Sequence, residues 1–268
     1  MTFNTGETTE SLRQEYNPEG SVLREVQNRM LEMLLYLDET CKKLGIQYRL
    51  DGGSVLGAVR HGGFIPWDDD MDVSIMRKDW EKLIKYMKEN PHPQFVLQDH
   101  STDSGFYRSW AKIRDKKSRY MRYGTVEMYE NMRGAQLDLF PFEEGRLDTF
   151  YTVCKFFEWL NIHYFIGKCK PMADFTRFLS LNVSRPVFNV ITKVVGKKGY
   201  QGHSYGAPWS LKFPNEICWP AKPIEFEGHM VMGPADPVGL CKLIYGKNWG
   251  NLPPKEKREV HADEIELL

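Results

Sequence analysis

The sequence predicts an α/β (α+β) domain with a helical insertion and a C-terminal part rich in Pro and Trp. In the first half of the chain, segments with apolar residues at helical spacing alternate with short segments of period two. Residues 151–200 have a helical pattern that is dense in aromatic and basic side chains. From Gly206 onward, Pro, Gly and Trp become frequent and the strand-like pieces are short. The 268 residues suffice for one large domain with an appended subdomain.

Helices and strands can be assigned in order along the first half. Val22, Val26 and Met30 begin an apolar stripe at helical spacing, and Gly45 marks the end of that helix. The expected helices span residues 21–44, 55–60 (with Ser54 as its N-cap) and 78–89. The expected strands span residues 46–50, 70–75, 95–97, 108–113 and 135–140 (ended by Pro141), with a short one near 224–226. We expect a flexible lead over residues 1–20 and one domain over residues 21–268, whose helical insertion lies at about 150–200.

The composition argues against two classes of protein. Lys plus Arg and Asp plus Glu each number 36, so the formal net charge is zero, whereas a general nucleic-acid binder carries a basic excess. The hydrophobic content of 41% and aromatic content of 13% are too high for a disordered chain. The charges are nevertheless unevenly placed. Four acids fall within residues 68–72, and residues 151–200 hold eight basic against two acidic side chains.

Cysteine usage and the N-terminal composition favour a cytoplasmic protein. The five cysteines are widely spaced and form no CxxC motif, which is typical of reduced thiols and argues against a zinc site. Residues 1–20 are polar and lack the apolar core of a signal peptide. No run of 18 apolar residues occurs, so we expect no transmembrane helix.

Residues 70–75 alternate between acidic or polar and apolar side chains, as a strand with one buried face does. Asp70 and Asp72 are two residues apart, so both side chains point to the same face. Two carboxylates side by side repel each other unless a cation lies between them. Hard oxygen ligands suit Mg²⁺ or Mn²⁺, and the pattern therefore predicts a metal site.

Asp138 has the same local form, a single acid between Leu137 and Leu139 on an expected strand. If that strand lies beside the first, Asp138 would join Asp70 and Asp72 in a three-carboxylate site for two metal ions. Taken alone, Asp138 fits a helix cap or an ion pair almost as well.

Two other interpretations of the acidic run remain open. Residues 68–72 would also suit a solvated turn, although such turns seldom alternate with Met, Val and Ile. A calcium loop starting at Asp68 would need Gly where Val73 stands and Glu where Asp79 stands, so the match is poor.

Gly52, Gly53 and Ser54 follow an expected strand and open an expected helix. Glycines let the backbone approach an anion closely, and a helix N-terminus offers free N–H groups. This short motif by itself is often just a turn, but phosphate-transfer sites combine such a turn with metal-binding acids. The candidate cations for phosphate oxygens are Arg60, His61, Lys112 and Arg114.

The segments that carry these motifs resemble those of a known family. The run DGGSVLGAVRHGGFIPWDDDMDV at residues 51–73 is similar to the signature of the LicD family of bacterial phosphocholine transferases, which are related to fukutin and fukutin-related protein. The resemblance continues through WAKIRDK at 110–116 and LDLFP at 137–141. Further matching positions are Phe226, Glu227, Gly228, Tyr245, Gly246, Pro253, Pro254 and His261. It covers residues 20–262 and is weakest in the helical insertion.

The resemblance implies a fold and a set of site residues. The fold would be a nucleotidyltransferase-like mixed sheet flanked by helices. Gly53 and Ser54 would hold the phosphate of the donor, Asp70 and Asp72 would bind metal, and Asp138 would be the third acid. Asp68 and Asp69 match the family run as well, and whether Asp68 touches metal stays open.

The resemblance also implies a reaction, and two alternatives to it stay open. A transferase dependent on Mg²⁺ or Mn²⁺, with two ions, would move phosphocholine or a similar phospho-alcohol from CDP-choline or a related CDP-alcohol. The acceptor would be a hydroxyl of a cell-surface glycan or lipopolysaccharide, and CMP would leave. Asp138 would help to deprotonate that hydroxyl. The alternatives are a nucleotidyltransferase that passes NMP to a small acceptor and a non-catalytic glycan-binding protein.

The tryptophans and the basic segment at residues 151–200 suggest two further binding features. A quaternary ammonium group is recognised by aromatic rings together with an acid. The candidates are Trp67, Trp110, Trp219 and Trp249, with Glu227 as the anion, and core packing is the alternative for each Trp. The basic segment at residues 151–200 would either hold a lipid-linked glycan or contact the inner face of an anionic membrane, or pack as a subdomain with its basic residues in water.

Overall fold

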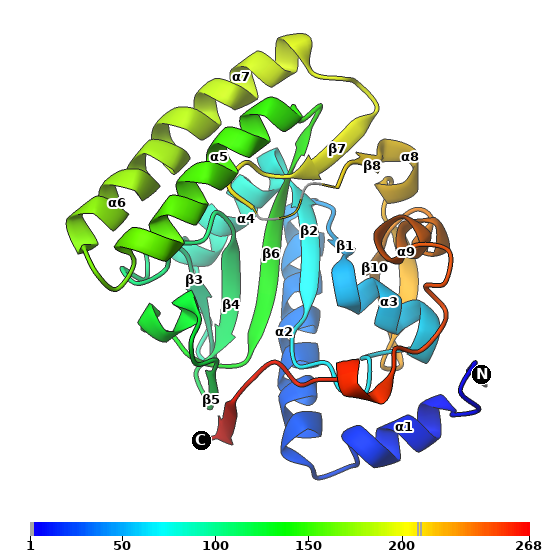
Figure 1. Ribbon diagram of the computed structural model, residues 1–268. Coiled ribbons are helices and arrows are strands. Elements are labelled where there is room, and N and C mark those ends of the chain that lie inside the picture. The colour runs from blue at the N-terminus through cyan, green and yellow to red at the C-terminus, as the bar shows by residue number, and fades with distance from the viewer. Residues whose placement is uncertain (1–2, 208, 210) are drawn as a thin grey trace.

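The computed structural model describes residues 3–207, 209 and 211–268. The main sheet consists of β1 (Arg49–Leu50), β2 (Asp72–Met76), β3 (Phe95–Gln98), β4 (Ala111–Asp115), β6 (Gln136–Glu144), β7 (Tyr200–His203) and β8 (Phe213–Pro214). Its order is β1–β2–β6–β4–β3, with β7 paired to β6 and β8 to β7 (Figure 1). The pair β2–β6 is parallel and the other pairs are antiparallel, so the predicted mixed α/β fold is confirmed.

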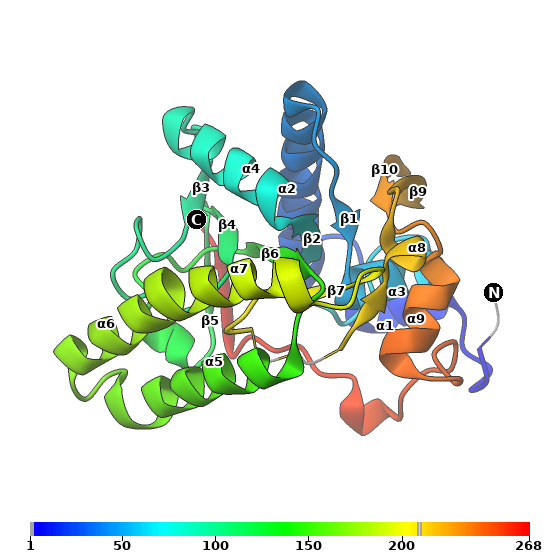
Figure 2. The same ribbon diagram turned by 90° about the horizontal axis from the view of Figure 1, so that it is seen from above.

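Helices cover both faces of this sheet, as Figure 2 shows from above. On one face lie α2 (Val22–Leu44) and α4 (Arg77–Glu89). On the other face lies a helical hairpin made of α5 (Asp148–Leu160), η2 (Asn161–Phe165), α6 (Lys170–Phe178), η3 (Leu179–Ser184) and α7 (Arg185–Val195). At the β1 end lie α3 (Gly52–His61), α8 (Asn215–Cys218) and α9 (Pro237–Tyr245). The helical character expected for residues 151–200 is therefore confirmed.

Smaller elements complete the described chain. They are α1 (Thr9–Tyr16), the hairpin of β9 (Lys222–Phe226) and β10 (His229–Gly233), the pair of β5 (Ser118–Met121) and β11 (Glu264–Leu267), and the short η1 (Val126–Tyr129) and η4 (Lys255–Lys257). In the part of the chain that the structure describes, none of the helices is long and apolar enough to cross a bilayer. The five cysteines are all free thiols, and Cys169 alone among them is exposed.

The long helix α2 forms for the reasons that its sequence suggests. The Ser21 side chain caps it by accepting a hydrogen bond from Arg24 N at 3.2 Å. Gly45 ends it in the left-handed region with φ of 62°, which glycine adopts without strain. Val26 and Met30 are fully buried in the core under the sheet. The predicted helix over residues 21–44 is thus confirmed to within one residue.

Several predicted boundaries differ from the structure. The strands expected over residues 46–50, 70–75 and 108–113 are β1 at 49–50, β2 at 72–76 and β4 at 111–115, so Asp70 lies just before its strand. The helix expected to start at residue 55 after a Ser54 N-cap begins at Gly52, because Ser54 Oγ accepts from Asp72 N at 2.8 Å instead of capping the helix. The strand expected to end at Pro141 continues to Glu144 as β6. Proline removes only its own donor, and the Pro141 carbonyl still accepts from Ser204 N at 2.9 Å.

The predicted lead over residues 1–20 contains the helix α1. Thr8 and Ser11 form a reciprocal capping box at its start. Leu12 is fully buried in the core, and Arg13 lies 2.9 Å from the Glu227 carboxylate. This segment is therefore packed on the domain in the structure.

The packing of α3 against the loop that follows it depends on Gly57. A Cβ at this position would lie 2.4 Å from Gly63 O and 3.1 Å from Ile65 N, and neither backbone atom can move aside freely. We expect Gly57→Ala to lower the free energy of unfolding by about 1–3 kcal/mol through overpacking, measured by thermal and urea unfolding. Gly250→Ala is the matched control, since a Cβ there meets nothing within 4 Å. Equal melting temperatures for the two variants would contradict the packing argument.

Candidate active site

Three neighbouring strands bring the predicted acids to one place in the sheet. The parallel pairing of β2 with β6 aligns Asp72 with Asp138. On the other side of β6, Lys112 of β4 is the antiparallel partner of Asp138. Asp70 lies two residues before Asp72, and the intervening Met71 O accepts a hydrogen bond from Asp138 N at 2.7 Å. The register therefore collects Asp70, Asp72 and Asp138 beside one buried lysine.

The start of α3 lies directly against these carboxylates. Gly52 has φ of 50°, and a Cβ there would lie 2.5 Å from Asp72 Oδ2. A Cβ on Gly53 would lie 2.8 Å from Asp68 Oδ2. The two glycines are thus required for the helix N-terminus to approach the acids so closely. Ser54, in the first turn, is tied to β2 through its hydroxyl.

Asp51, the residue that precedes α3, is held by a buried network that the sequence did not reveal. Arg49 Nη1 lies 3.0 Å from Asp51 Oδ1. The Ser74 hydroxyl donates to Asp51 Oδ2, and His203 Nε2 lies 3.5 Å from the same oxygen. Burial by itself would raise the pKa of Asp51, but Arg49 and the hydrogen bonds from His203 and Ser74 hold it well below its usual range. Asp51 is therefore an anion at neutral pH.

Asp69 is fully buried and fixes the C-terminal segment beside the acids. Its carboxylate accepts hydrogen bonds from Tyr120 OH at 3.2 Å, His261 Nδ1 at 2.9 Å and Ala262 N at 2.7 Å. The hydrogen bond to Asp69 raises the pKa of His261. Sequence analysis missed this role because the partners come from β5 and from the end of the chain.

The remaining acids repel one another. Burial raises the pKa of Asp70, and it raises those of Asp68 and Asp72 well above their usual range. The Asp70 carboxylate raises the pKa of Asp68 and Asp72 further, and Asp138 raises those of Asp70 and Asp72. Such a cluster gains stability from a bound cation. Carboxylate oxygens suit the hard ions Mg²⁺ and Mn²⁺, so the donor set fits the metal that the family resemblance implies.

The ligand-capable atoms converge at a point beside the predicted triad. Asp68, Asp69 and His261 each place a potential metal-ligand atom within 4.8 Å of the other two. Among residues 3–207, 209 and 211–268, the set Asp70, Asp72 and Asp138 does not meet this distance. The predicted carboxylates are therefore neighbours that would have to draw together to share an ion.

Two buried donors lie beside Asp138. Its Oδ1 lies 3.4 Å from Lys112 Nζ and accepts a hydrogen bond from Trp110 Nε1 at 3.2 Å. Lys112 also lies 2.6 Å from Gln136 Oε1 and 3.6 Å from Glu127 Oε1. The Lys112 amine is thus buried next to the acids, and its role as a phosphate-side cation stays a prediction.

The fold places the other predicted cations in different surroundings. Arg60 lines the cleft described below, donating to His61 Nε2 at 2.9 Å and to Asn251 O at 3.2 Å. Burial lowers the pKa of Arg60 to about 10 and that of His61 to about 3, so His61 is neutral. The structure does not bring Arg114 to the acids: its side chain is buried, with Nη2 lying 2.6 Å from Glu130 Oε2.

A two-armed cleft opens over the acids. The larger arm has a volume of about 550 Å³, and a smaller arm of about 250 Å³ adjoins it. Both arms are lined by Gly53, Asp72 and Tyr245, while Asp68 and Asp70 line the larger one. These sizes suit a ligand whose two halves diverge from a charged centre.

The smaller arm has aromatic walls. The Trp209 ring lies 4.9 Å from that of Phe140 and 5.0 Å from that of His203, measured between centroids. Phe213 and Tyr245 complete the wall. The sequence offered no signal for this set, because its members come from β6, the β7–β8 region and α9.

The predicted choline-binding tryptophans do not gather in that arm. Trp67 lines the larger arm, with the Arg258 guanidinium 5.2 Å from its ring centroid. Trp249 also lines the larger arm. Trp219 lines neither arm, and its Nε1 donates to Gln201 Oε1 at 2.8 Å.

Glu227 has a structural position. Its buried carboxylate lies 2.9 Å from Arg13 Nη2 and 2.8 Å from Arg24 Nη2, and it accepts from Phe64 N at 3.1 Å. A Cβ on Gly63 would overlap Glu227 Oε1. With two arginines and a backbone donor in place, this carboxylate ties α1, α2 and the loop after α3 together and does not face either arm of the cleft.

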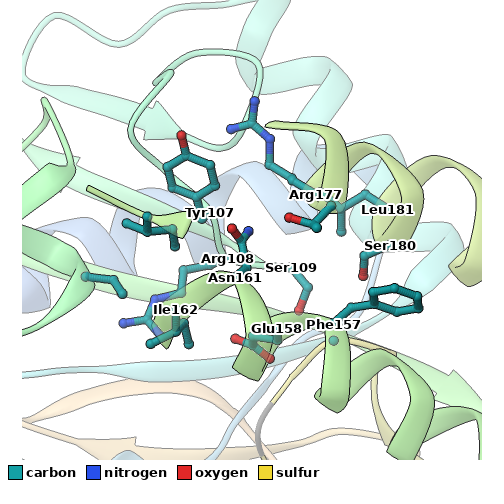
Figure 3. Close-up of a pocket in the computed structure, with 14 residues that line it drawn as sticks. Tyr107, Arg108, Ser109, Phe157, Glu158, Asn161, Ile162, Arg177, Ser180 and Leu181 are labelled. Carbon is teal, nitrogen blue, oxygen red and sulfur yellow. The ribbon is translucent and has the colours of Figure 1, made fainter. Parts of the chain in front are cut away.

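A separate small cavity lies where the helical hairpin meets the rest of the domain (Figure 3). Its volume is about 30 Å³, which suffices for about one or two water molecules. Within the described chain, side-chain atoms of Arg108, Ser109, Glu158 and Asn161 that line it have no hydrogen-bond partner. Figure 3 shows these side chains around the same space, and burial raises the pKa of Glu158 to about 7.

The protein is a mixed α/β domain in which aspartates lie against a helix that begins with two glycines. This is the arrangement that the resemblance implies for a nucleotidyltransferase-type domain. The family model described as LicD/FKTN/FKRP, nucleotidyltransferase domain, matches residues 45–187, which is just over half of the chain. The chain belongs to the LicD family.

Two curated relatives illustrate the similarity. The lipopolysaccharide cholinephosphotransferase LicD of Haemophilus influenzae is 38% identical over 76 residues, which cover 28% of this chain and 29% of that protein. The ribitol 5-phosphate transferase FKRP of Homo sapiens is 46% identical over 48 residues, which cover 18% of this chain and 10% of that protein. The chain thus matches less than a third of the length of either relative.

The raised pKa of Glu158 predicts a pH dependence of stability. In the unfolded chain the carboxyl ionises near its ordinary pKa of 4.5, whereas in the folded protein it keeps its proton up to about pH 7. Between these values the folded state binds more protons, so stability falls as pH rises, by on the order of 3 kcal/mol in total. We expect Glu158→Gln to remove this loss, so that the variant's advantage in melting temperature grows from pH 5 to pH 8.

Asp174→Asn, on the exposed side of the same hairpin, is the control for Glu158→Gln. An advantage that does not change with pH would contradict the burial of an ionisable group in this cavity.

Proposed function

We propose that this protein transfers phosphocholine or a similar phospho-alcohol from a CDP-linked donor to a hydroxyl of a cell-surface glycan or lipopolysaccharide, releasing CMP. The observation that carries the proposal is the position of buried aspartates against the Gly52–Gly53–Ser54 helix start, at the junction of a two-armed cleft. Membership of the LicD family and the names of the two relatives support the same reaction class.

The cleft suggests how the donor would bind. Its diphosphate would lie at the junction of the arms, near the free N–H groups of the first turn of α3. The nucleoside would occupy the larger arm, near Arg60 and Trp67, and the alcohol the smaller, aromatic arm. Lys112, buried beside Asp138, would offset part of the donor's negative charge.

Asp70, Asp72 and Asp138 would hold the metal that the family implies. Bound Mg²⁺ or Mn²⁺ would neutralise the diphosphate and lower the barrier to its cleavage. Without a cation, the acidic cluster would repel the anionic donor. A bound cation would offset the charge of both the aspartates and the diphosphate.

Side chains and backbone N–H groups of the chain would accept the proton and stabilise the leaving group. The acceptor oxygen would form a bond to the phosphorus that bears the alcohol, and the bond from that phosphorus to the CMP oxygen would break. The proton of the acceptor hydroxyl would pass to Asp138, whose Oδ1 is fixed by Trp110 and Lys112. CMP would leave as an anion, with the N–H groups of the α3 start and Lys112 nearby.

The proposed reaction is tested by CMP release from CDP-choline, CDP-ethanolamine, CDP-ribitol and CDP-glycerol with a glycan acceptor. We expect Asp70→Asn and Asp72→Asn each to reduce turnover by at least about a hundredfold, because each removes a proposed metal ligand. Asp148→Asn, which alters an exposed aspartate on α5, is the matched control and should keep full activity.

Mass spectrometry of the acceptor separates the alternatives. A gain of the phospho-alcohol supports the proposal, whereas a gain of a nucleotide would replace it with nucleotidyl transfer. Full turnover in Asp70→Asn and Asp72→Asn would refute the metal assignment.

The aromatic arm predicts which donor is preferred. Rings surrounding a quaternary ammonium contribute up to about 2 kcal/mol when desolvated, and a polyol gains no such energy. We expect Trp209→Ala to raise KM for CDP-choline about tenfold relative to KM for CDP-ribitol. Trp219→Phe, at a tryptophan outside the cleft, should leave that ratio unchanged. A ratio that moves in the Trp219 variant and not in the Trp209 variant would place the alcohol elsewhere.

A further inference from the structure

Exposed apolar side chains concentrate on the helical hairpin. Of the 25 large hydrophobic residues exposed in the described chain, 13 lie between residues 153 and 195. This segment makes up only about a sixth of the sequence. Scattered exposed hydrophobic residues are ordinary, but a concentration of this kind marks a surface that another phase or molecule covers.

The exposed residues form stripes at helical spacing. On α7, Val187, Val190 and Val194 follow one another at i, i+3 and i+7, with exposed fractions of 50%, 64% and 81%. On α5, Phe156 and Trp159 have exposed fractions of 55% and 45%. Each helix therefore presents an apolar side to its surroundings and not only isolated side chains.

Both stripes point away from the core. The opposite sides of α5 and α7 pack on a common residue, Tyr205, through Cys154 and Tyr151 of α5 and through Phe188 and Thr192 of α7. The two helices lie side by side in Figures 1 and 2, on the side of the sheet opposite α2 and α4. Their exposed apolar and basic side chains between residues 153 and 198 are called here the hairpin surface.

The hairpin surface is also basic. Its exposed lysines are Lys155, Lys168, Lys170, Lys193, Lys197 and Lys198. Of the two acids in the same segment, Asp174 pairs with Lys170 at 3.2 Å and with Arg177 at 3.0 Å, and Glu158 faces the internal cavity, so neither acid pairs with the other five lysines. The exposed charge that remains is therefore positive.

This combination selects one kind of occupant. A second copy of the chain would bring two basic surfaces together, and nucleic acid would place phosphates on valine and phenylalanine. An anionic bilayer satisfies both features, because acyl chains cover the apolar stripe and acidic headgroups pair with the lysines. Trp and Tyr side chains are favoured at this interface, and Trp159 and Tyr164 are exposed on the hairpin. We propose that the hairpin surface is a peripheral membrane-binding surface for anionic lipid.

The proposal is tested by vesicle flotation of the whole protein, without donor or acceptor. The vesicles are phosphatidylcholine alone and phosphatidylcholine mixed with an equal part of phosphatidylglycerol. We expect binding to the mixed vesicles that weakens with added salt, and weak binding to the neutral ones. Val190→Glu and Val194→Glu, each placing an anion in the apolar stripe of α7, should lower the bound-to-free ratio by roughly tenfold or more.

Met230→Glu is the matched control, since Met230 has an exposed fraction of 60% on β10 and lies outside the hairpin surface. It should bind vesicles like the unaltered protein, and circular dichroism should show equal folding for all variants. Lys193→Gln combined with Lys197→Gln should reduce binding to the anionic vesicles only.

Absence of flotation, equal binding to both vesicle types, or equal loss in the Met230→Glu control would overturn the proposal. A dimer in sedimentation velocity that Val190→Glu abolishes would overturn it as well, in favour of a second copy. These readouts use no enzymatic activity, so they are independent of the proposed reaction.

Discussion

The structure depends on the burial of several carboxylates at one junction of β2, β6 and α3. Burying a carboxylate without a partner is costly, so each must be offset by a cation or by donors. Arg49 does this for Asp51, and Lys112 does so for Asp138. The two carboxylates against the helix start, Asp68 and Asp72, have no comparable cation beside them among the salt bridges of the described residues, and the raised pKa values record that imbalance. A region so unbalanced has the character of a binding site, because functional sites retain arrangements that stability alone would remove.

Backbone geometry makes this concentration of acids possible. With side chains at residues 52 and 53, α3 would collide with the carboxylates opposite it. Gly57 lets α3 pack closely on the loop that follows it, and Gly63 of that loop leaves room for the Glu227 side chain. The Glu227 carboxylate, bridged by arginines of α1 and α2, then holds that loop in place. The glycines of the family run thus serve two ends: one pair faces the site and the other fixes the helix that carries it.

Much of the fold and part of the site could be predicted because the signals are local. Period two at residues 70–75 and the single acid between two leucines indicated two acid-bearing strands, and the structure shows that these strands are adjacent, with Asp72 paired to Asp138. What could not be predicted depends on contacts between distant parts of the chain. His261 and Asp69 are separated by 192 residues, and the Asp51 carboxylate also contacts Ser74 of β2 and His203 of β7. Composition likewise suggested tryptophans for a cage without telling which of them would face the cleft.

Charge separation links the two functional surfaces. The sequence is neutral overall, yet four of its 36 acids lie together at residues 68–72 and eight of its 36 basic residues lie at residues 151–200, where only two acids accompany them. Under the two proposals, each surface takes a partner from outside the chain: a cation at the cleft, and anionic lipid at the hairpin surface. An acceptor glycan built on a lipid would present its hydroxyl near such a phase, while a CDP-linked donor is water-soluble and would reach the cleft from the other side. Separate surfaces for the two partners would allow a membrane-bound acceptor and a soluble donor to be bound at the same time.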